Sequence, residues 1–458
     1  MGVVVSIILA RLIAPASYGI IALVMVFVTL AQIFVDSGFG TALVQKKDAD
    51  DLDFSSVFYF NLFICVCIYA LLFFTAPWIE KFYAMPDLTQ VVRILSLSII
   101  FSGVSAIQGA YVARNMLFKR MCVVSLFATI LSGIAGIYMA YQGQGIWALV
   151  YQQLIGQVLT VILLWSVVKW RPLLRFSWQR LSKLFSFGWK LLISALLDRG
   201  YNNLRQLLIG KFYTPADLAF YERGNNFPML IINNLVASID AVLLPTLSQE
   251  QDHRERVRSM ARRAIKTSTL LIMPLMMGLA MCGEPLVRLV LTEKWLSSVP
   301  YLQTLCFSYS FWTIHTTNLN AINALGRSDI FLKLEIAKKI VGLILIALTL
   351  PYGVLALALS TIPSSIICQL INSYPNKYLL QYSYWEQLKD MLPQILLTCF
   401  MGIVLWFTGK LPLPDWQMLI MQFVIGASVY TGLAYIFKLE SFNYLIALIR
   451  GMKKQNDN

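Results

Sequence analysis

Charged and amide side chains are concentrated inside one apolar segment, residues 185–209. They form two neighbouring stripes at helical spacing: Asp198, Asn202 and Arg205 on one, and Arg199, Asn203 and Gln206 on the other. A guanidinium group binds phosphate oxygens through two parallel hydrogen bonds, and amides can hydrogen-bond to sugar hydroxyls. The pattern predicts a wet cationic surface for a phosphorylated ligand. The alternative is an ion pair, from Asp198 to Arg205 or to another helix, that only holds helices together.

The following apolar segment, residues 218–246, continues this pattern with Glu222 and Asn226 four residues apart. Asn residues at this spacing are also common as hydrogen-bonding contacts between membrane helices, which is the alternative reading. The complete set of predicted substrate-binding residues is Arg199, Arg205, Arg223, Asn202, Asn203, Asn226, Asn320 and Arg11. Asp198 and Glu222 are the predicted carriers of a proton or Na⁺, which would couple the protein to an ion gradient.

The sequence contains no pattern that indicates an enzyme, a metal site or a bound cofactor. A P-loop, a GxSxG elbow and an HExxH motif are all absent, so the chain is not expected to hydrolyse ATP or to carry these hydrolytic sites. The seven cysteines include no CxxC pair, and the two histidines, His253 and His315, are isolated. We therefore expect a binding or transport protein with no catalytic residues.

The elements that position these residues are membrane helices. Hydrophobic residues make up 58% of the 458 residues and charged ones 13%, with a mean hydropathy of +0.68. A soluble fold could not bury this much apolar surface. Helices are predicted at 1–13, 18–36, 54–76, 90–113, 121–140, 146–168, 185–209, 218–246, 264–282, 301–325, 330–350, 354–374, 391–408 and 417–437. The first is shorter than a full span, which predicts a truncated first helix.

The net charge of +14 is distributed as a topology signal and does not indicate nucleic acid as a partner. Alternate connections between the helices carry 22 basic residues on one side and six on the other. The basic side is predicted to face the cytoplasm, which places the C-terminal tail there and the protein in the bacterial inner membrane. No connection on the opposite side is long enough for a separate domain.

An internal repeat relates residues 10–20, ARLIAPASYGI, to residues 210–220, GKFYTPADLAF. Six predicted helices separate the two copies, so both would have the same orientation in the membrane. The repeat predicts an all-α membrane protein of two six-helix lobes, residues 1–168 and 185–374. Residues 391–437 would form two accessory transmembrane helices, and residues 438–458 a cytoplasmic tail.

The repeated motifs carry a resemblance to a known family. The stretch SIILARLIAPASYGIIALVMVFVTLAQIFVDSGFGTALVQ resembles the start of Wzx-type flippases, which belong to the polysaccharide transport branch of the MATE-like exporter superfamily. LLIGKFYTPADLAFYERGNNFP, followed by LLPTLSQEQDHRERVR, is similar to the second-lobe signature of members that resemble colanic acid exporters. The resemblance covers nearly the whole chain.

This resemblance implies transport of an undecaprenyl-pyrophosphate-linked oligosaccharide from the inner to the outer leaflet, by two lobes that alternate around a cationic cavity. It implies membrane lipid, the lipid-linked glycan and polysaccharide polymerase or chain-length machinery as partners, with O-antigen or exopolysaccharide as the product. Arg205 departs from the family's acidic residue in the NLDxLLIGK-like position. The alternatives are a MATE-like small-molecule or ion antiporter, which should have an acidic cavity, and a lipid II flippase. A glycan polymerase is disfavoured because it would carry a large periplasmic loop.

Overall fold

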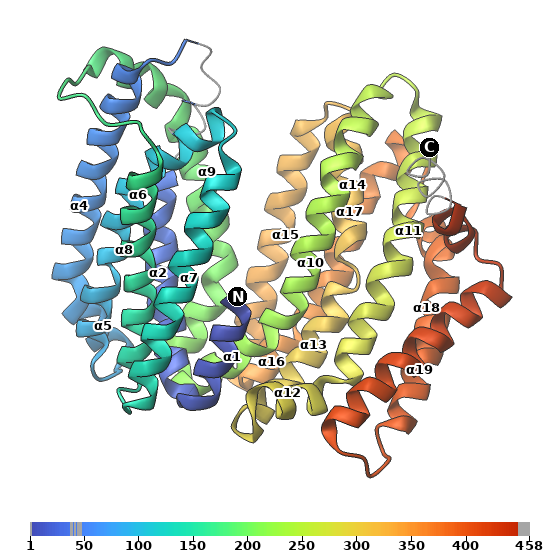
Figure 1. Ribbon diagram of the computed structural model, residues 1–458. Helices are drawn as coiled ribbons and strands as arrows, with labels where there is room; N and C mark the ends of the chain where they lie inside the picture. Colours follow the sequence, from blue (N-terminus) through green and yellow to red (C-terminus); the bar gives the residue numbers. More distant parts are fainter. Residues whose placement is uncertain (1, 37–39, 41–42, 44–47, 448–458) are drawn as a thin grey trace, which may run out of the picture. The chain divides into compact units, whose positions relative to one another are not determined.

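The computed structural model describes residues 2–36, 40, 43 and 48–447, and its regular structure within these ranges is entirely helical (Figure 1). The chain divides into two compact units, Met1–Ala219 and Phe220–Asn458. Each unit has its own buried apolar clusters. The division falls inside one long helix, α10 (Pro215–Gln249), shortly after that helix begins.

The first unit contains the helices α1 (Gly2–Leu12), α2 (Pro15–Asp36), α4 (Asp51–Tyr83), α5 (Leu88–Leu95), α6 (Leu97–Arg114), α7 (Phe118–Tyr141), α8 (Ile146–Val167) and α9 (Trp178–Phe212). Its core is aromatic: Phe54 and Phe58 of α4 pack with Trp170, which follows α8. The indole Nε1 of Trp170 donates a hydrogen bond to Asp51 Oδ1 at 3.1 Å. Trp170 thereby fixes the connection after α8 to the start of α4, because its ring is buried while its polar atom reaches the helix end.

Two glycines mark close contacts of α2, one with the start of α10 and one with α9. A methyl group on Gly19 would lie 1.6 Å from the carbonyl oxygen of Pro215, and one on Gly210 would lie 2.9 Å from Leu23 Cδ1. Small residues allow membrane helices to approach at backbone distance. Gly19 and Pro215 belong to the two copies of the repeated motif. The two copies therefore pack against each other within the first unit.

The second unit contains most of α10 together with α11 (Arg254–Met281), α12 (Gly283–Leu291), the 3-10 turn η1 (Glu293–Ser298), α13 (Val299–Tyr309), α14 (Trp312–Ala324), α15 (Ser328–Thr349), the 3-10 turn η2 (Leu350–Tyr352), α16 (Val354–Leu359), α17 (Thr361–Leu379), α18 (Tyr384–Thr408) and α19 (Asp415–Ile436). Helix α11 lies at the centre and packs against α13, α14 and α18. Its buried Ile265 joins Ile314 of α14 and Met391 of α18 in one apolar cluster.

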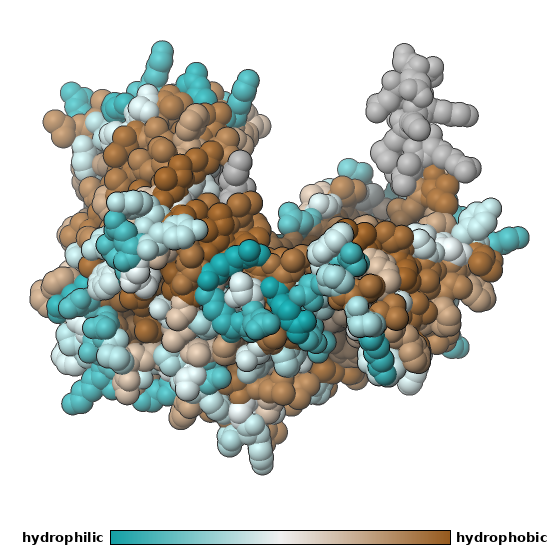
Figure 2. All heavy atoms as spheres, turned by 60° about the horizontal axis from the view of Figure 1, so that its bottom comes forward, coloured by the Kyte–Doolittle hydropathy of each residue, from teal (hydrophilic) through white to brown (hydrophobic). Residues whose placement is uncertain are grey.

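The outer surface of these helices is suited to lipid. Ten helical spans in the described residues are long and apolar enough to cross a membrane, the first at Pro15–Val35 and the last at Asp415–Ile436. Large apolar side chains such as Phe63 and Trp78 are exposed, and Figure 2 shows apolar residues over much of the surface in view. This exposure would cause aggregation in water, whereas hydrocarbon accommodates it. The chain is a multi-pass membrane protein.

The predicted helix ranges agree with the structure in order, but three predicted helices are interrupted. The ranges 90–113, 301–325 and 354–374 each contain two helices, which meet at Ser96, Ser310 and Ser360. The hydroxyl of Ser310 donates to the carbonyl of Cys306 at 2.9 Å, and that of Ser360 to the carbonyl of Leu357 at 2.7 Å. Such bonds compete with the helical ladder and bend the chain, which apolar periodicity does not reveal.

Helix α11 extends into the polar segment 248–263. Helix α11 begins at Arg254, ten residues before the predicted start at residue 264. Arg258 pairs with Glu386 at 2.9 Å, and Arg262 pairs with Asp390 at 2.6 Å, both across to α18. Partners distant in sequence therefore stabilise a turn that the charges alone would leave in solvent.

The two lobes, residues 1–168 and 185–374, remain a prediction of the halves that move relative to each other during transport. The compact units divide the chain at a different place, since α9 packs against α2 and α4 and belongs to the first unit. The accessory pair predicted at 391–437 corresponds to α18 and α19, which pack against each other and against α11. Residues 448–458 of the predicted tail lie outside the described residues.

Candidate functional site

Helix α9 carries the polar stripes of the first unit. Asn202 Nδ2 donates a hydrogen bond to Asp198 Oδ2 at 3.1 Å, and Asn203 Nδ2 donates to the backbone carbonyl of Arg199 at 2.7 Å. Asp198, Arg199 and Asn202 are exposed. Each bond links residues four apart, as the helical repeat requires. The two stripes are therefore preorganised along α9 and accessible from outside the unit.

Arg205 lies one turn farther along α9 and is half-buried. Its Nε is buried and has no hydrogen-bond partner among the described residues. A buried donor without an acceptor costs about 1–3 kcal/mol, so an acceptor that reaches it would be bound favourably. Arg205 thus has one buried donor without an acceptor among the described residues.

Arg223 belongs to the second unit, where its guanidinium lies 5.3 Å from the ring centre of the fully buried Trp295. Close helix packing sets this position, because a methyl group on Gly224 would lie 2.8 Å from the backbone nitrogen of Leu302 on α13. A guanidinium over an indole ring is stabilised by a cation–π contact. On the same helix Glu222 is half-buried and Asn226 is exposed.

The remaining predicted residues are Asn320 and Arg11. Asn320 of α14 donates from Nδ2 to Asp240 Oδ1 of α10 at 2.7 Å, which links two helices of the second unit. Arg11 is exposed at the end of α1, a helix that packs against α7. The structure thus groups Asp198, Arg199, Asn202 and Asn203 along α9, and holds Arg223 and Asn320 on separate contacts. A single chamber shared by all of them remains a prediction.

Sequence analysis missed a layer of buried amides in the second unit. Asn318 of α14 and Gln387 of α18 exchange two hydrogen bonds, at 2.9 and 3.0 Å, and Asn376 of α17 donates to Asn318 Oδ1 at 2.7 Å. All three side chains are almost completely buried. The only sequence signal was one amide within each of three predicted helices. The three amides are far apart along the chain, so no local spacing links them.

The sequence prediction also omitted the charges of α15. Lys338 forms an ion pair with Glu335, one turn earlier on the helix. Lys333 and Lys339 lie on the same helix, and α15 is not among the ten apolar spans. The available signal was a predicted span with far more charge than a membrane helix normally tolerates.

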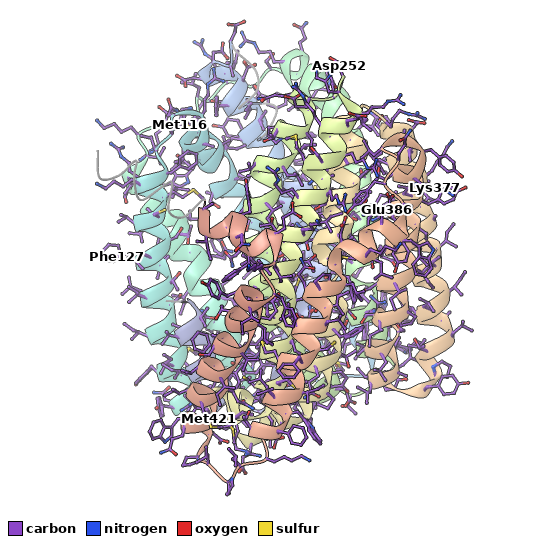
Figure 3. All side chains as sticks on the ribbon, turned by 90° about the vertical axis from the view of Figure 1, so that its right-hand side faces the viewer. Met116, Phe127, Asp252, Lys377, Glu386 and Met421 are labelled. Carbon is purple, nitrogen blue, oxygen red and sulfur yellow. The ribbon has the colours of Figure 1, made fainter. Side chains whose placement is uncertain are left out.

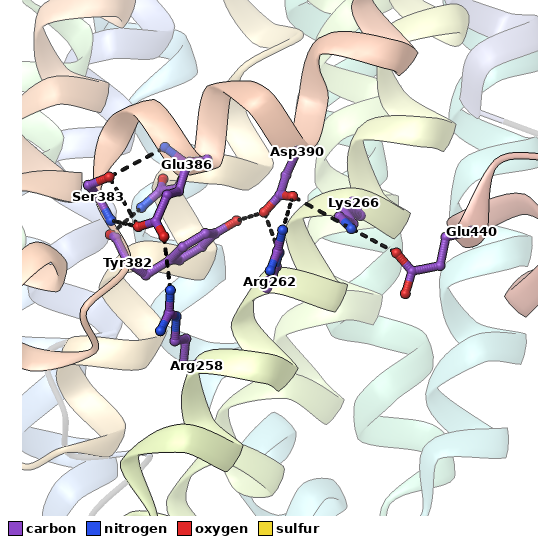
Figure 4. Close-up of polar contacts among 9 residues, drawn as sticks. Arg258, Arg262, Lys266, Tyr382, Ser383, Glu386, Asp390 and Glu440 are labelled. Atoms are coloured by element: carbon purple, nitrogen blue, oxygen red, sulfur yellow. Dashed lines mark hydrogen bonds and ion pairs between the residues drawn. The ribbon is translucent and has the colours of Figure 1, made fainter.

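An ionic cluster fastens α11 to α18 and to the segment after α19 (Figure 4). Arg262 binds the buried carboxylate of Asp390 through two bonds of 2.6 Å, and Tyr382 donates to the same group at 2.8 Å. Lys266 lies 3.5 Å from Asp390 and 2.7 Å from Glu440. The hydrogen bond from Lys266 lowers the pKa of the Glu440 carboxyl. The shared acceptors make this cluster a structural clamp.

An apolar cavity of about 740 Å³ lies between α11, α12, α18 and α19. Its walls include Leu275, Leu286, Met401 and Phe423, and Phe442 closes part of it. Figure 3 views the α18–α19 hairpin from its outer side, with Glu386 and Met421 toward opposite ends. A cavity lined this way excludes water and accepts hydrocarbon. Among the described residues, no group of three His, Cys, Asp or Glu side chains could hold a metal ion.

Residues 8–300 match the family described as polysaccharide biosynthesis protein. The chain belongs to this family. It is similar to the teichuronic acid biosynthesis protein TuaB of Bacillus subtilis, with 27% identity over 82% of this chain and 78% of TuaB. It is also similar to the lipopolysaccharide biosynthesis protein WzxC of Escherichia coli, with 22% identity over 88% of this chain and 85% of WzxC. The predicted resemblance to Wzx-type proteins is confirmed.

Solved structures show the fold of this family member. The inward closed form of the lipid II flippase MurJ superposes with a TM-score of 0.77 over 97% of both chains, at 17% identity. An inward-facing MATE family multidrug transporter of the MOP superfamily gives a TM-score of 0.66 over 84% of this chain and 96% of the transporter, at 14% identity. The predicted all-α, MATE-like membrane fold is therefore confirmed.

Proposed function

We propose that the protein moves an undecaprenyl-pyrophosphate-linked oligosaccharide repeat unit from the inner to the outer leaflet of the bacterial inner membrane. The observation that carries this proposal is that the second unit contains an apolar cavity, a layer of buried amides and an ion pair on α15. A cargo with a long hydrocarbon tail, a diphosphate and sugars requires these three surfaces together. Membership of the family and the similarity to TuaB and WzxC support the same cargo class.

The residues of the chain fit transport better than catalysis. Guanidinium groups such as Arg199 and Arg205 would bind the diphosphate, and exposed amides such as Asn202 would hydrogen-bond to the sugars. Asp198 or Glu222 would bind the proton or Na⁺ that drives the cycle. The product would feed a polysaccharide polymerase and its chain-length machinery for O-antigen or exopolysaccharide. The C-terminal tail would face the cytoplasm.

The proposal is tested by replacing the two α9 arginines in a strain that lacks the chromosomal copy. Arg199→Ala and Arg205→Ala should each lower surface polysaccharide, and the lipid-linked repeat unit should accumulate in the inner leaflet. The leaflet is measured by oxidising exposed sugars in sealed vesicles of known orientation. Arg254→Ala, an exposed arginine at the start of α11, is the matched control. Immunoblots of membranes confirm equal protein levels.

Normal polysaccharide output from the Arg199→Ala/Arg205→Ala protein at native expression would refute the role of these arginines. Drug or cation efflux that depends on expression of the protein, with no change in surface glycans, would instead identify a MATE-like antiporter. Replacement of an essential lipid II flippase by this chain would identify the third candidate.

A further inference from the structure

The ion pair of Glu335 and Lys338 lies halfway along α15, which corresponds to the predicted transmembrane helix 330–350. Helix α15 contains 22 residues, and Lys338 is the eleventh of them. At about 1.5 Å per residue, Lys338 is about 15 Å from the start of a helix about 33 Å long. In a helix that spans a hydrocarbon core of roughly 30 Å, this position is near the centre.

Both charges lie on the side of α15 that faces the rest of the second unit. Gly342 and Ile346 follow on the same helical face and are buried. Helix α15 packs against α14 and α17, and the three helices lie beside one another in Figure 1. The side chain of Lys338 is 15% exposed and that of Glu335 is 28% exposed. The pair is therefore covered by protein but still reachable.

Helices α14 and α17, which pack against α15, carry polar side chains. One of these side chains is the half-buried His315 of α14. Asn372 of α17 is fully buried, and its Nδ2 lies 3.3 Å from His315 Nδ1. Three helices that pack against one another thus carry a cation, an imidazole and a buried amide.

A purely structural role does not account for this pair. A lysine or a carboxylate at the bilayer centre costs about 2.5–3.5 kcal/mol on insertion scales. Pairing offsets that cost, but an apolar pair of similar volume is often as stable or more stable. Glu335 accepts one hydrogen bond from the Lys338 ammonium, which has three N–H donors. A second acceptor can therefore bind to the ammonium and replace Glu335.

We propose that Glu335 is a displaceable counter-ion, and that a phosphate anion of the membrane-embedded substrate takes its place on Lys338. A ring N–H of His315 donates a second hydrogen bond to the anion. Glu335 pairs with the ammonium while the site is empty, and it returns when the anion leaves. This inference rests on the proposed function for the identity of the anion, a diphosphate attached to a lipid.

A binding experiment tests the site without transport. The purified full-length protein in detergent is titrated with geranylgeranyl diphosphate, inorganic pyrophosphate and geranylgeraniol, with the melting temperature as the readout. Lys338→Met should bind geranylgeranyl diphosphate about tenfold more weakly, as expected for one lost charge-assisted hydrogen bond. Glu335→Gln should bind it more tightly, because no carboxylate competes. Lys333→Met, an exposed lysine on the same helix, is the matched control and should bind like the wild type.

The three probes separate the sources of affinity. Geranylgeraniol should bind all variants equally, and pyrophosphate should show the same order of variants as the lipid diphosphate. Equal affinity of Lys338→Met and wild-type protein for geranylgeranyl diphosphate would overturn the proposal. Weaker binding by Glu335→Gln would overturn it as well, since the carboxylate would then be assisting and not competing.

A cellular experiment separates an exchangeable pair from a structural one. Lys338→Met should lower surface polysaccharide, and the Lys338→Met/Glu335→Gln protein should remain as low. A structural pair predicts recovery in the double variant, because both uncompensated charges are then removed. Recovery would overturn the inference and leave the proposed function standing. The proposed function alone would be refuted by a different pair of results. The purified variants would bind in the expected order, but deletion of the chain would leave the surface glycans unchanged.

Discussion

The two compact units are stabilised in different ways. The core of the first unit is largely apolar and aromatic, and Trp170 to Asp51 and Arg180 to Asp50 are polar contacts at helix ends. Two buried amides of this unit, Asn61 and Gln108, bond to Cys65 and to the carbonyl of Trp170 and not to each other. The second unit has buried amides bonded to one another, between Asn318 of α14 and Gln387 near the start of α18, and an ion pair halfway along α15. Apolar packing tolerates small shifts, whereas buried hydrogen bonds fix particular partners. The difference indicates that the second unit requires defined arrangements of its helices.

The strongest expected effect concerns the tightest helix crossing of the first unit. Gly19→Ala places a methyl group on the carbonyl oxygen of Pro215, where neither backbone can move away. We expect a loss above about 4 kcal/mol in the free energy of unfolding, or no folded protein in the membrane. Gly200→Ala is the control, because no atom lies within 4 Å of its added methyl group. Equal melting temperatures for the two variants would mean that packing does not dominate this unit.

The next effect concerns the amide layer of the second unit. Asn318→Leu removes four side-chain hydrogen bonds. It leaves Gln387 and Asn376 buried with only long contacts, to the carbonyl of Tyr382 at 3.4 Å and to the backbone carbonyl of residue 318 at 3.3 Å. Each incompletely satisfied group should cost about 1–3 kcal/mol. Thermal unfolding in detergent measures the loss, with the exposed Asn323→Leu of the same helix as control. Replacing all three amides by leucine should recover part of the loss. A triple variant less stable than Asn318→Leu would contradict the hydrogen-bond explanation.

A smaller effect is expected when a polar contact at a helix end is removed. Trp170→Phe keeps most of the aromatic packing and loses only the hydrogen bond to Asp51. Because Asp51 is exposed, water can replace the indole, and the free energy of unfolding should fall by about 1 kcal/mol. Trp170→Ala should cost about 3–5 kcal/mol because it also empties the core. If both variants lost a similar free energy of unfolding, the stabilisation by Trp170 would come mainly from its hydrogen bond and not from its packing.

The smallest effect is the pH dependence of the first unit. The hydrogen bond from Arg180, with a second from the Asp53 backbone, lowers the pKa of Asp50. Stabilisation from a depressed carboxyl pKa is complete above the unfolded value near 3.9 and is lost as the pH falls through the lower folded value. Since the pair is exposed, the change should be below about 1 kcal/mol. Asp50→Asn should abolish it in melting curves between pH 6 and pH 3, and Asp48→Asn should not.

The sequence was informative where burial in lipid dominates. Long apolar runs predicted the spanning helices, and the repeated ARLIAPASYG and GKFYTPADLAF motifs indicated the family. It was uninformative where a contact joins residues far apart along the chain. The partners Asn318 and Gln387, or Arg262 and Asp390, share no local pattern, and the breaks at Ser310 and Ser360 depend on single hydroxyl bonds.

The charge of α15 has a consequence for how the protein is made. A helix with lysines at positions 333, 338 and 339 and a glutamate at 335 partitions poorly from the translocon into bilayer on its own. It can be retained in the membrane only when neighbouring segments shield its ionic groups, and α14 and α17 provide those contacts. Because α17 is synthesised after α15, the charges of α15 are fully shielded only after α17 has been inserted. Biogenesis of this half of the chain is therefore cooperative and not one segment at a time.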